Sequence, residues 1–299
     1  MLEISLVNKN SFKNIKSIYF VKIIFSYLNE KSKLEIIKYN KYLQNILFIK
    51  LINYKFLSGK YIIYETNGKG KEYDGEDDSL KFEGEYLNGR KNGIGKEYFY
   101  KGKLKFEGEY LNGKKNSESK EYYYDRKIKF EGEYFNGLEW NGKGYDKNNN
   151  IVYELNNGKG YVKEYYDNGK LIFEGAYLNG LKNGKGKEYF NDELLFEGEY
   201  LNGLKNGRGK EYYFGDNLKF EGEYLNGLEW NGKGYDINNN IVYELNNGKG
   251  YVKEYNNFGK LEFEGEYLNG LKNGKGKEYD YYGNLIFEGE YLNGFKVYK

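Results

Sequence analysis

The chain has 299 residues, with 47 Lys or Arg, 45 Asp or Glu, and no His, Cys or Pro. Without Cys there are no disulfides, thiolate metal sites or cysteine nucleophiles, and without His the commonest general base and zinc ligand are missing. The formal net charge of +2 gives no overall field that would favour nucleic acid. We therefore expect a protein that is not an enzyme, holds no cofactor or metal ion, and has no nucleic-acid partner.

A change of composition near residue 58 predicts two domains. The first 57 residues contain ten Lys, three Glu and no Gly, whereas all 41 glycines lie from Gly59 onward. We expect one domain over residues 1–57 and a second over residues 58–299. No apolar run is long enough to span a bilayer, and the first residues lack the pattern of a secretory signal. These features predict a cytoplasmic location, with peripheral membrane association as the alternative.

Residues 15–57 have the periodicity of helices. Apolar residues recur there at the spacing of one helical face, namely at Ile18, Val21, Ile24, Phe25 and Leu28. Ser32 followed by Glu35 fits a capping box, which predicts a second helix with Ser32 as its N-cap. Because fewer than sixty residues give a thin core, we expect this segment to dock on the first hairpin as a short α-helical cap.

Three roles stay open for this helical segment. The string Ile-Phe-Ser-Tyr-Leu, a short break and a second helix from Leu34 loosely resemble an F-box-like motif, although the usual proline is missing. The resemblance implies a ubiquitin-ligase adaptor that docks a Skp1-like protein, with Phe25, Leu28 and Leu34 as candidate contacts. The alternatives are a plain structural cap and a basic amphipathic segment that lies on an anionic membrane surface.

From about residue 60 the chain is a tandem repeat. The string FEGEY, once FEGAY, begins at Phe82, Phe106, Phe130, Phe173, Phe196, Phe220, Phe263 and Phe287. Tyr64, Tyr153 and Tyr243 take the Phe position in shortened repeats, which gives about eleven repeats in all. Residues 130–189 and 220–279 differ at only seven of sixty positions, so a larger block has been duplicated.

Each repeat has the pattern of a β-hairpin. In residues 104–110 apolar and charged residues alternate, as in a strand with one apolar and one charged face. The Asn-Gly pairs in residues 179–184 predict a turn, and residues 187–190 a second strand. The glycine in the middle of FEGEY either makes room for a ring from the neighbouring strand or marks a bulge. Successive hairpins then form an antiparallel meander.

The repeat resembles the MORN repeat (membrane occupation and recognition nexus) in its pattern F-E-G-E-Y-x-N-G-x-x-N-G-x-G-x-x-x-Y. The resemblance covers about residues 60–299 and implies a mainly β protein, an elongated single-layer antiparallel β-meander that serves as an interaction scaffold. In some family members the repeat is linked to membranes. One layer is not expected to bury so long an aromatic face, so we expect part of it to line a groove or stack on a second copy as a homodimer.

Three features of the repeat region are candidate sites. Trp140 and Trp230 follow a Glu that replaces Lys before Asn-Gly, which places each ring in a turn, either as a partner anchor or packed on the adjacent loop. Asp146 and the asparagines after it resemble the start of a calcium loop but lack its glycine and final glutamate, which predicts an Asn-rich turn. The repeated glutamates of FEGEY predict cross-strand Glu–Lys pairs. The overall expectation is a protein-binding scaffold.

Overall fold

The computed structural model describes residues 18–28, 30–37, 40–48, 59–65 and 67–298. The chain forms two compact parts, an N-terminal part over residues 1–104 and a C-terminal part over residues 105–299, and each is treated by itself. The boundary expected between residues 57 and 58 lies outside the described residues.

The described residues of the N-terminal part include three short helices around a small apolar core. They are α1 (Ile18–Ser26), α2 (Glu30–Ile37) and α3 (Lys41–Ile46). Their core consists of Val21, Phe25, Leu34, Ile37 and Leu43, all fully buried. The helical periodicity is confirmed. The expected N-cap is wrong, because α2 already begins at Glu30, two residues before Ser32.

Four strands complete the N-terminal part, each antiparallel to the next. They are β1 (Lys60–Tyr64), β2 (Lys69–Asp74), β3 (Leu80–Leu87) and β4 (Arg90–Tyr98), and they precede a short 3₁₀ segment, η2 (Tyr100–Gly102). Strands β3 and β4 form the first complete FEGEY hairpin, joined by an Asn-Gly turn.

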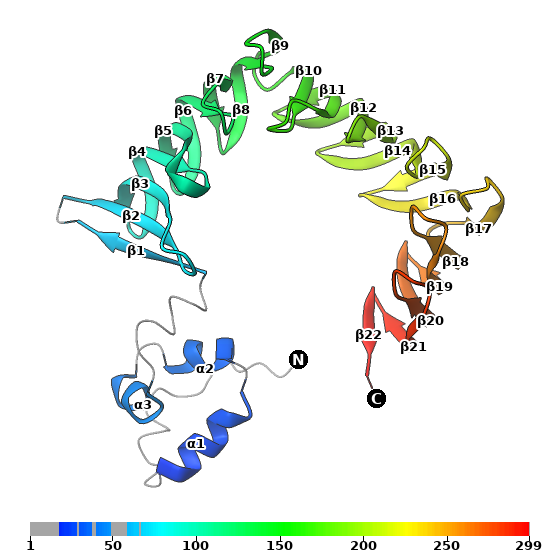
Figure 1. Ribbon diagram of the computed structural model, residues 1–299, viewed down its shortest axis with the longest axis horizontal. Helices are drawn as coiled ribbons and strands as arrows, with labels where there is room; N and C mark the ends of the chain where they lie inside the picture. The colour runs from blue at the N-terminus through cyan, green and yellow to red at the C-terminus, as the bar shows by residue number, and fades with distance from the viewer. Residues whose placement is uncertain (1–17, 29, 38–39, 49–58, 66, 299) are drawn as a thin grey trace. The chain divides into compact units, whose positions relative to one another are not determined.

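In the C-terminal part the hairpins follow one another in chain order (Figure 1). Its strands are β5 (Leu104–Leu111), β6 (Lys114–Tyr122), β7 (Ile128–Phe135), β8 (Leu138–Tyr145), β9 (Ile151–Leu155), β10 (Gly160–Tyr165), β11 (Leu171–Leu178), β12 (Leu181–Phe190), β13 (Glu193–Leu201), β14 (Leu204–Tyr212), β15 (Leu218–Leu225), β16 (Leu228–Tyr235), β17 (Ile241–Leu245), β18 (Gly250–Tyr255), β19 (Leu261–Leu268), β20 (Leu271–Tyr279), β21 (Leu285–Leu292) and β22 (Phe295–Val297). The predicted antiparallel meander is confirmed, and the described residues contain 22 strands in all.

The hairpin turns are tighter than expected. Asn179 and Gly180, with φ of +54° and +74°, make the whole turn, and β12 starts at Leu181 instead of at residue 187. Two consecutive residues with positive φ are typical of the two-residue hairpin turn whose twist matches that of the strands. The segment Leu-Lys-Asn-Gly is therefore strand, and its side chains alternate between the two faces of the sheet.

The ladder is interrupted twice, at the shortened hairpins. One sheet ends at β9, the next runs from β10 to β17, and the last from β18 to β22. In an ordinary hairpin the central glycines of the two strands face each other, and a Cβ on Gly175 would lie 2.7 Å from the Cα of Gly186. In β9 and β10 these positions hold Leu155 and Val162, both buried. Two branched side chains do not fit where the two backbones come this close, so β9 and β10 do not pair as neighbouring strands of one sheet.

The phenylalanine of each FEGEY lies over the facing glycines. The end of the Phe173 ring lies 2.6 Å from where a Cβ would stand on Gly175 and 2.7 Å from one on Gly186. The pairing of β11 with β12 also shifts register between Gly175 and Tyr177. The central glycine does make room for a ring and does adjoin a bulge, but the ring belongs to its own strand, two residues earlier, and not to the neighbouring strand as expected.

We call the side of the sheets that carries these phenylalanines the ring face. The expectation that part of this aromatic face stays open is wrong for all but one of the phenylalanines, since only Phe287 is partly exposed and lines a groove. Seven of the eight have no exposed surface: Phe82, Phe106, Phe130, Phe173, Phe196, Phe220 and Phe263. Tyr200 meets the Phe173 ring edge-on at 5.6 Å, and the Lys182 ammonium lies 4.1 Å from the ring centre. Tyrosine and lysine side chains of this kind cover the phenylalanine rings, so a single-layer sheet can bury its own aromatic core.

Candidate interaction surfaces

The face opposite the rings, which we call the charged face, carries the first glutamate of each FEGEY. On β12 to β15 successive strands present opposite charges, and Lys187 pairs with Glu197 at 3.3 Å and Lys210 with Glu221 at 3.0 Å. Tyrosine hydroxyls donate to the same carboxylates, as from Tyr212 to Glu197 at 2.9 Å. The predicted cross-strand Glu–Lys ladder is confirmed. Its members are well exposed, so each pair contributes little stability.

A groove runs along the charged face above the glycines of β12 to β15. Its volume is about 780 Å³, and its floor is formed by the glycines of the four strands, Gly186, Gly198, Gly209 and Gly222. On one side of the floor stands the ladder just described, and on the other a second charged row that includes Lys185, Glu199, Arg208 and Glu223. Tyr161 of β10 also lines the groove, with 57% of its surface exposed.

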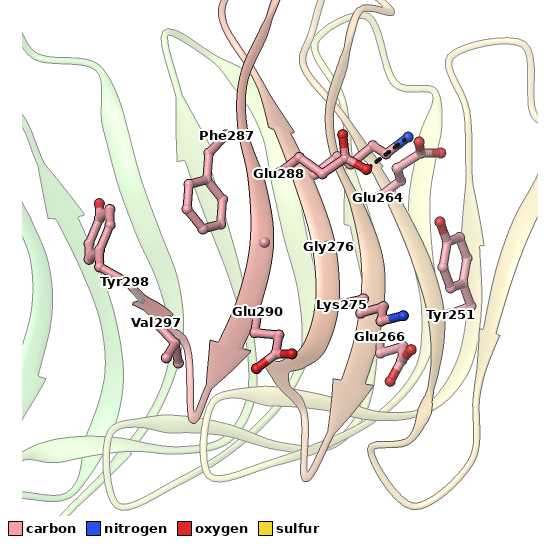
Figure 2. Close-up of a pocket in the computed structure, with 12 residues that line it drawn as sticks. Tyr251, Glu264, Glu266, Lys275, Gly276, Phe287, Glu288, Glu290, Val297 and Tyr298 are labelled. Carbon is pink, nitrogen blue, oxygen red and sulfur yellow. Dashed lines mark ion pairs between the residues drawn. The ribbon is translucent and has the colours of Figure 1, made fainter.

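A second groove of about 700 Å³ lies at the corresponding place in the last sheet. Figure 2 shows Tyr251, the counterpart of Tyr161, beside Glu264 and Glu266, with Glu288 and Glu290 on the next acidic strand. Both grooves therefore follow a break between sheets and contain a tyrosine from the first strand after it.

A comparison with protein families agrees with this geometry. The model of the MORN repeat matches residues 82–103, 173–193, 196–215 and 263–281, each of which is an ordinary FEGEY hairpin. The chain is a MORN-repeat protein. No curated protein matches it. In this MORN chain the shortened hairpins and the hairpins with tryptophan lie outside the matched stretches.

The two tryptophans do not lie in turns. Trp140 is in β8 and Trp230 in β16, because the extra residue is absorbed into the strand. Trp140 is partly buried: its carbonyl accepts the Gly158 N–H at 2.7 Å, and a Cβ on Gly158 would lie 2.8 Å from its ring. Trp230 repeats this contact with Gly248. The rings thus pack on the adjacent turn, and a role as partner anchors stays a prediction.

The helical candidates divide between core and surface. Phe25 and Leu34 are fully buried, and Leu28 packs against the same cluster. Side chains in this position hold the helices together, so a partner would meet other residues first. The stretches that match the family lie between residues 82 and 281 and do not include this segment. None of the described helices is long and apolar enough to cross a membrane.

Asp146 forms the predicted Asn-rich turn. Its Oδ1 accepts the backbone N–H groups of Asn148 and Asn150 at 2.8 and 2.9 Å, and its Oδ2 accepts the Asn150 side chain at 2.9 Å. These bonds hold the pKa of Asp146 below its usual value against the opposing effect of burial. The carboxylate is therefore occupied in closing its own turn.

Sequence reasoning missed a partly buried carboxyl on the ring face. Glu139 of β8 takes the place that Lys182 has in an ordinary hairpin, and it accepts the Tyr153 hydroxyl at 2.7 Å. Burial, followed by the nearby Glu121, raises the pKa of Glu139 to about 7, although the Tyr153 hydrogen bond opposes the rise. The replacement of Lys by Glu was visible in the sequence, but the side of the sheet on which it falls was not.

Its neighbour Glu121 behaves in the opposite way. Burial acts to raise the pKa of this carboxyl, but Lys115 at 2.6 Å and Lys129 at 3.4 Å outweigh it and hold the pKa at about 2. Two carboxyls of the same partly buried cluster thus differ in charge near neutral pH. The duplicated block repeats the arrangement, with Glu229 bound to Tyr243 at 2.7 Å and its pKa raised to about 7, chiefly by burial.

Proposed function

We propose that the protein is a non-enzymatic scaffold that binds a protein partner in the grooves of its charged face. The observation that supports this most is the glycine floor over β12 to β15. The Cβ positions of these glycines point toward the ring face, so the floor between the two rows of charges is bare backbone that a ligand can approach. Alternating acidic and basic strands would then select the partner by its charge pattern, since complementary charge contributes mainly specificity and on-rate.

The chemistry of the groove favours binding over catalysis. Its carboxylates recur on every second strand, and those of the ladder are paired with lysines, as Glu197 is with Lys187. A catalytic acid or base is expected to differ from its neighbours in environment and pKa. The carboxylates of the ladder, such as Glu197, do not differ from one another in environment in the way expected of a catalytic group.

Affinity capture from the native cell tests this proposal. The intact protein is compared with the groove variant Lys185→Glu with Arg208→Glu, and with a matched control, Lys114→Glu with Lys249→Glu, which changes the net charge equally at exposed sites outside the groove. We expect the groove variant, but not the control, to lose a specific partner at least about tenfold. Equal capture by both variants, with the fold intact by circular dichroism, would contradict the groove as binding site.

A second candidate function is that of a ubiquitin-ligase adaptor, favoured by the exposed apolar side of α1. Tyr19 and Phe20 are 70% and 60% exposed there, and Ile24 is 42% exposed. A Skp1-like protein should bind the intact chain and lose binding with Tyr19→Asp and Phe20→Asp, which leave the helical core alone. No binding at micromolar concentration rules this out. Flotation with anionic liposomes, with and without residues 1–57, decides the membrane alternative in the same way.

A further inference from the structure

Three linked replacements mark the hairpin before each break between sheets. In an ordinary hairpin the ring face carries a Lys–Glu pair, such as Lys182 and Glu188 at 2.9 Å. In the hairpin of β7 and β8 the lysine is replaced by Glu139, and the residue opposite Phe130 is Gly144 instead of a glutamate. In the following strand Tyr153 stands where a phenylalanine is usual.

These replacements fit one another. A Cβ on Gly144 would overlap the Tyr153 ring, so the missing glutamate leaves the space that this ring fills. The ring stacks on Phe130, with their centres 6.3 Å apart and their planes 20° apart. Its hydroxyl reaches Glu139 at 2.7 Å. A carboxyl and a phenol thus replace a pair of opposite charges within a packed aromatic core.

The charges around Glu139 oppose its ionisation. The groups that face it come from five strands: Glu121 and Lys115 of β6, Lys129 and Tyr134 of β7, Tyr153 of β9, Glu164 of β10 and Tyr177 of β11. Both lysines already bind Glu121, and Glu164 accepts the Tyr177 hydroxyl at 2.6 Å. At the second corner Lys272 also pairs with Glu254, the counterpart of Glu164, at 3.3 Å. An ionised Glu139 or Glu229 would therefore lie beside two other carboxylates whose lysines are already paired, in a partly buried site. This agrees with the rise of the pKa of Glu139 to about 7.

Trp140, the residue next to Glu139, takes part in the hydrogen bonds that cross the break between the two sheets. The Trp140 carbonyl accepts the Gly158 N–H at 2.7 Å, and the Gly158 carbonyl accepts the Gly180 N–H at 2.8 Å. The Asn141 side chain accepts the Asn157 N–H at 2.7 Å. Because β9 and β10 are not joined by a ladder, these bonds across the short turn link β8 to the sheet that follows. We call this set of bonds the corner, and its copy involves Trp230, Gly248 and Gly270.

We propose that Glu139 with Tyr153, and Glu229 with Tyr243, make the two corners sensitive to protons. With the carboxyl protonated the corner is closed. Loss of the proton places a charge in the aromatic core, weakens the packing of Tyr153 and loosens the bonds that Trp140 makes. Each corner leads directly into the strand that carries Tyr161 or Tyr251, so the pH would act on the end of each groove. The proton sensitivity of the corners does not depend on what the grooves bind.

Amide hydrogen exchange of the full chain tests the proposal. The corner amides of Gly158 and Gly180 are compared with Gly203, which makes a turn-to-turn bond of the same kind, to the Lys182 carbonyl, in the ordinary hairpin of β13 and β14. After correction for intrinsic exchange, we expect the ratio of corner to control rates to rise about tenfold between about pH 6 and about pH 8. A ratio that does not change with pH in the unmodified protein overturns the proposal.

The variant Glu139→Gln with Glu229→Gln shows whether these carboxyls are the cause. The amide keeps the shape of the protonated carboxyl and cannot ionise, so the ratio should stay constant with pH. The control Glu131→Gln with Glu221→Gln changes the charged face of the same hairpins and should keep the pH dependence. A glutamine variant with the unmodified pH dependence contradicts the assignment.

A second measurement guards against a variant that fails to fold. NMR of the unmodified protein with isotope-labelled glutamate should show two carboxyls that titrate near neutral pH, well separated from the exposed ones. If all glutamates titrate at acidic pH, the proposal is wrong whatever the variants do.

Discussion

The substitution Gly198→Ala tests the central packing argument of the repeat. A Cβ at this position would lie 2.6 Å from the Phe196 ring, 2.7 Å from the Arg208 carbonyl oxygen and 2.7 Å from the Cα of Gly209. All three distances are well inside van der Waals contact, and two of the three atoms belong to the backbone of the paired strand. Overpacking of this kind costs about 1 to 3 kcal/mol and more where the neighbours cannot move. We expect a loss of at least about 3 kcal/mol.

Denaturant unfolding followed by circular dichroism and tryptophan fluorescence measures this loss, provided that the two probes coincide. The control is Gly215→Ala, whose Cβ would meet nothing within 4 Å, so that only the cost of its positive φ of 85° remains. That cost is about 1 to 2 kcal/mol. A loss at Gly198 no larger than that at Gly215 would refute the close approach of the strands.

A double variant separates the ring from the backbone. Adding Phe196→Leu to Gly198→Ala removes the ring contact but leaves the contacts with Arg208 and Gly209. We therefore expect only partial rescue relative to the sum of the single changes. Complete rescue would show that the glycine is needed for the ring alone.

Three further outcomes are expected. Lys205→Met removes an ammonium that lies 4.1 Å from the centre of the buried Phe196 ring and 3.2 Å from the Glu211 carboxylate. Denaturant unfolding should show a loss of stability of about 1 to 2 kcal/mol. Lys187→Met, on the charged face, should cost less than about 0.5 kcal/mol. The pKa of Glu121 is lowered to about 2, so its stabilisation is present above about pH 4.5 and lost as the pH falls toward 2; Glu121→Gln should cost up to about 3 kcal/mol at pH 7 and nearly nothing at pH 2. Phe25→Asp should abolish the helical signal of residues 18–46 in NMR spectra, whereas Tyr19→Asp should preserve it, because only Phe25 is buried.

The repeat could be predicted because its signals are local. The alternation of Leu104, Phe106 and Tyr110 with charged residues requires a strand with two unlike faces, and Asn-Gly requires a tight turn. Both properties belong to a few consecutive residues, so eleven hairpins, their antiparallel order and the Glu–Lys ladder followed from the sequence. The helices followed in the same way from their apolar periodicity, apart from the start of α2.

Other features depend on which residues meet across strands, and these only the tertiary structure decided. The sequence contained Leu155 and Val162, but their effect arises because both fall where two glycines normally touch, and this splits the sheet. It also contained Glu139, but the register places that carboxyl on the ring face beside Tyr153. The period of the chain therefore determined the hairpins, whereas contacts between hairpins determined the breaks, the burial of the rings and the unusual carboxyls.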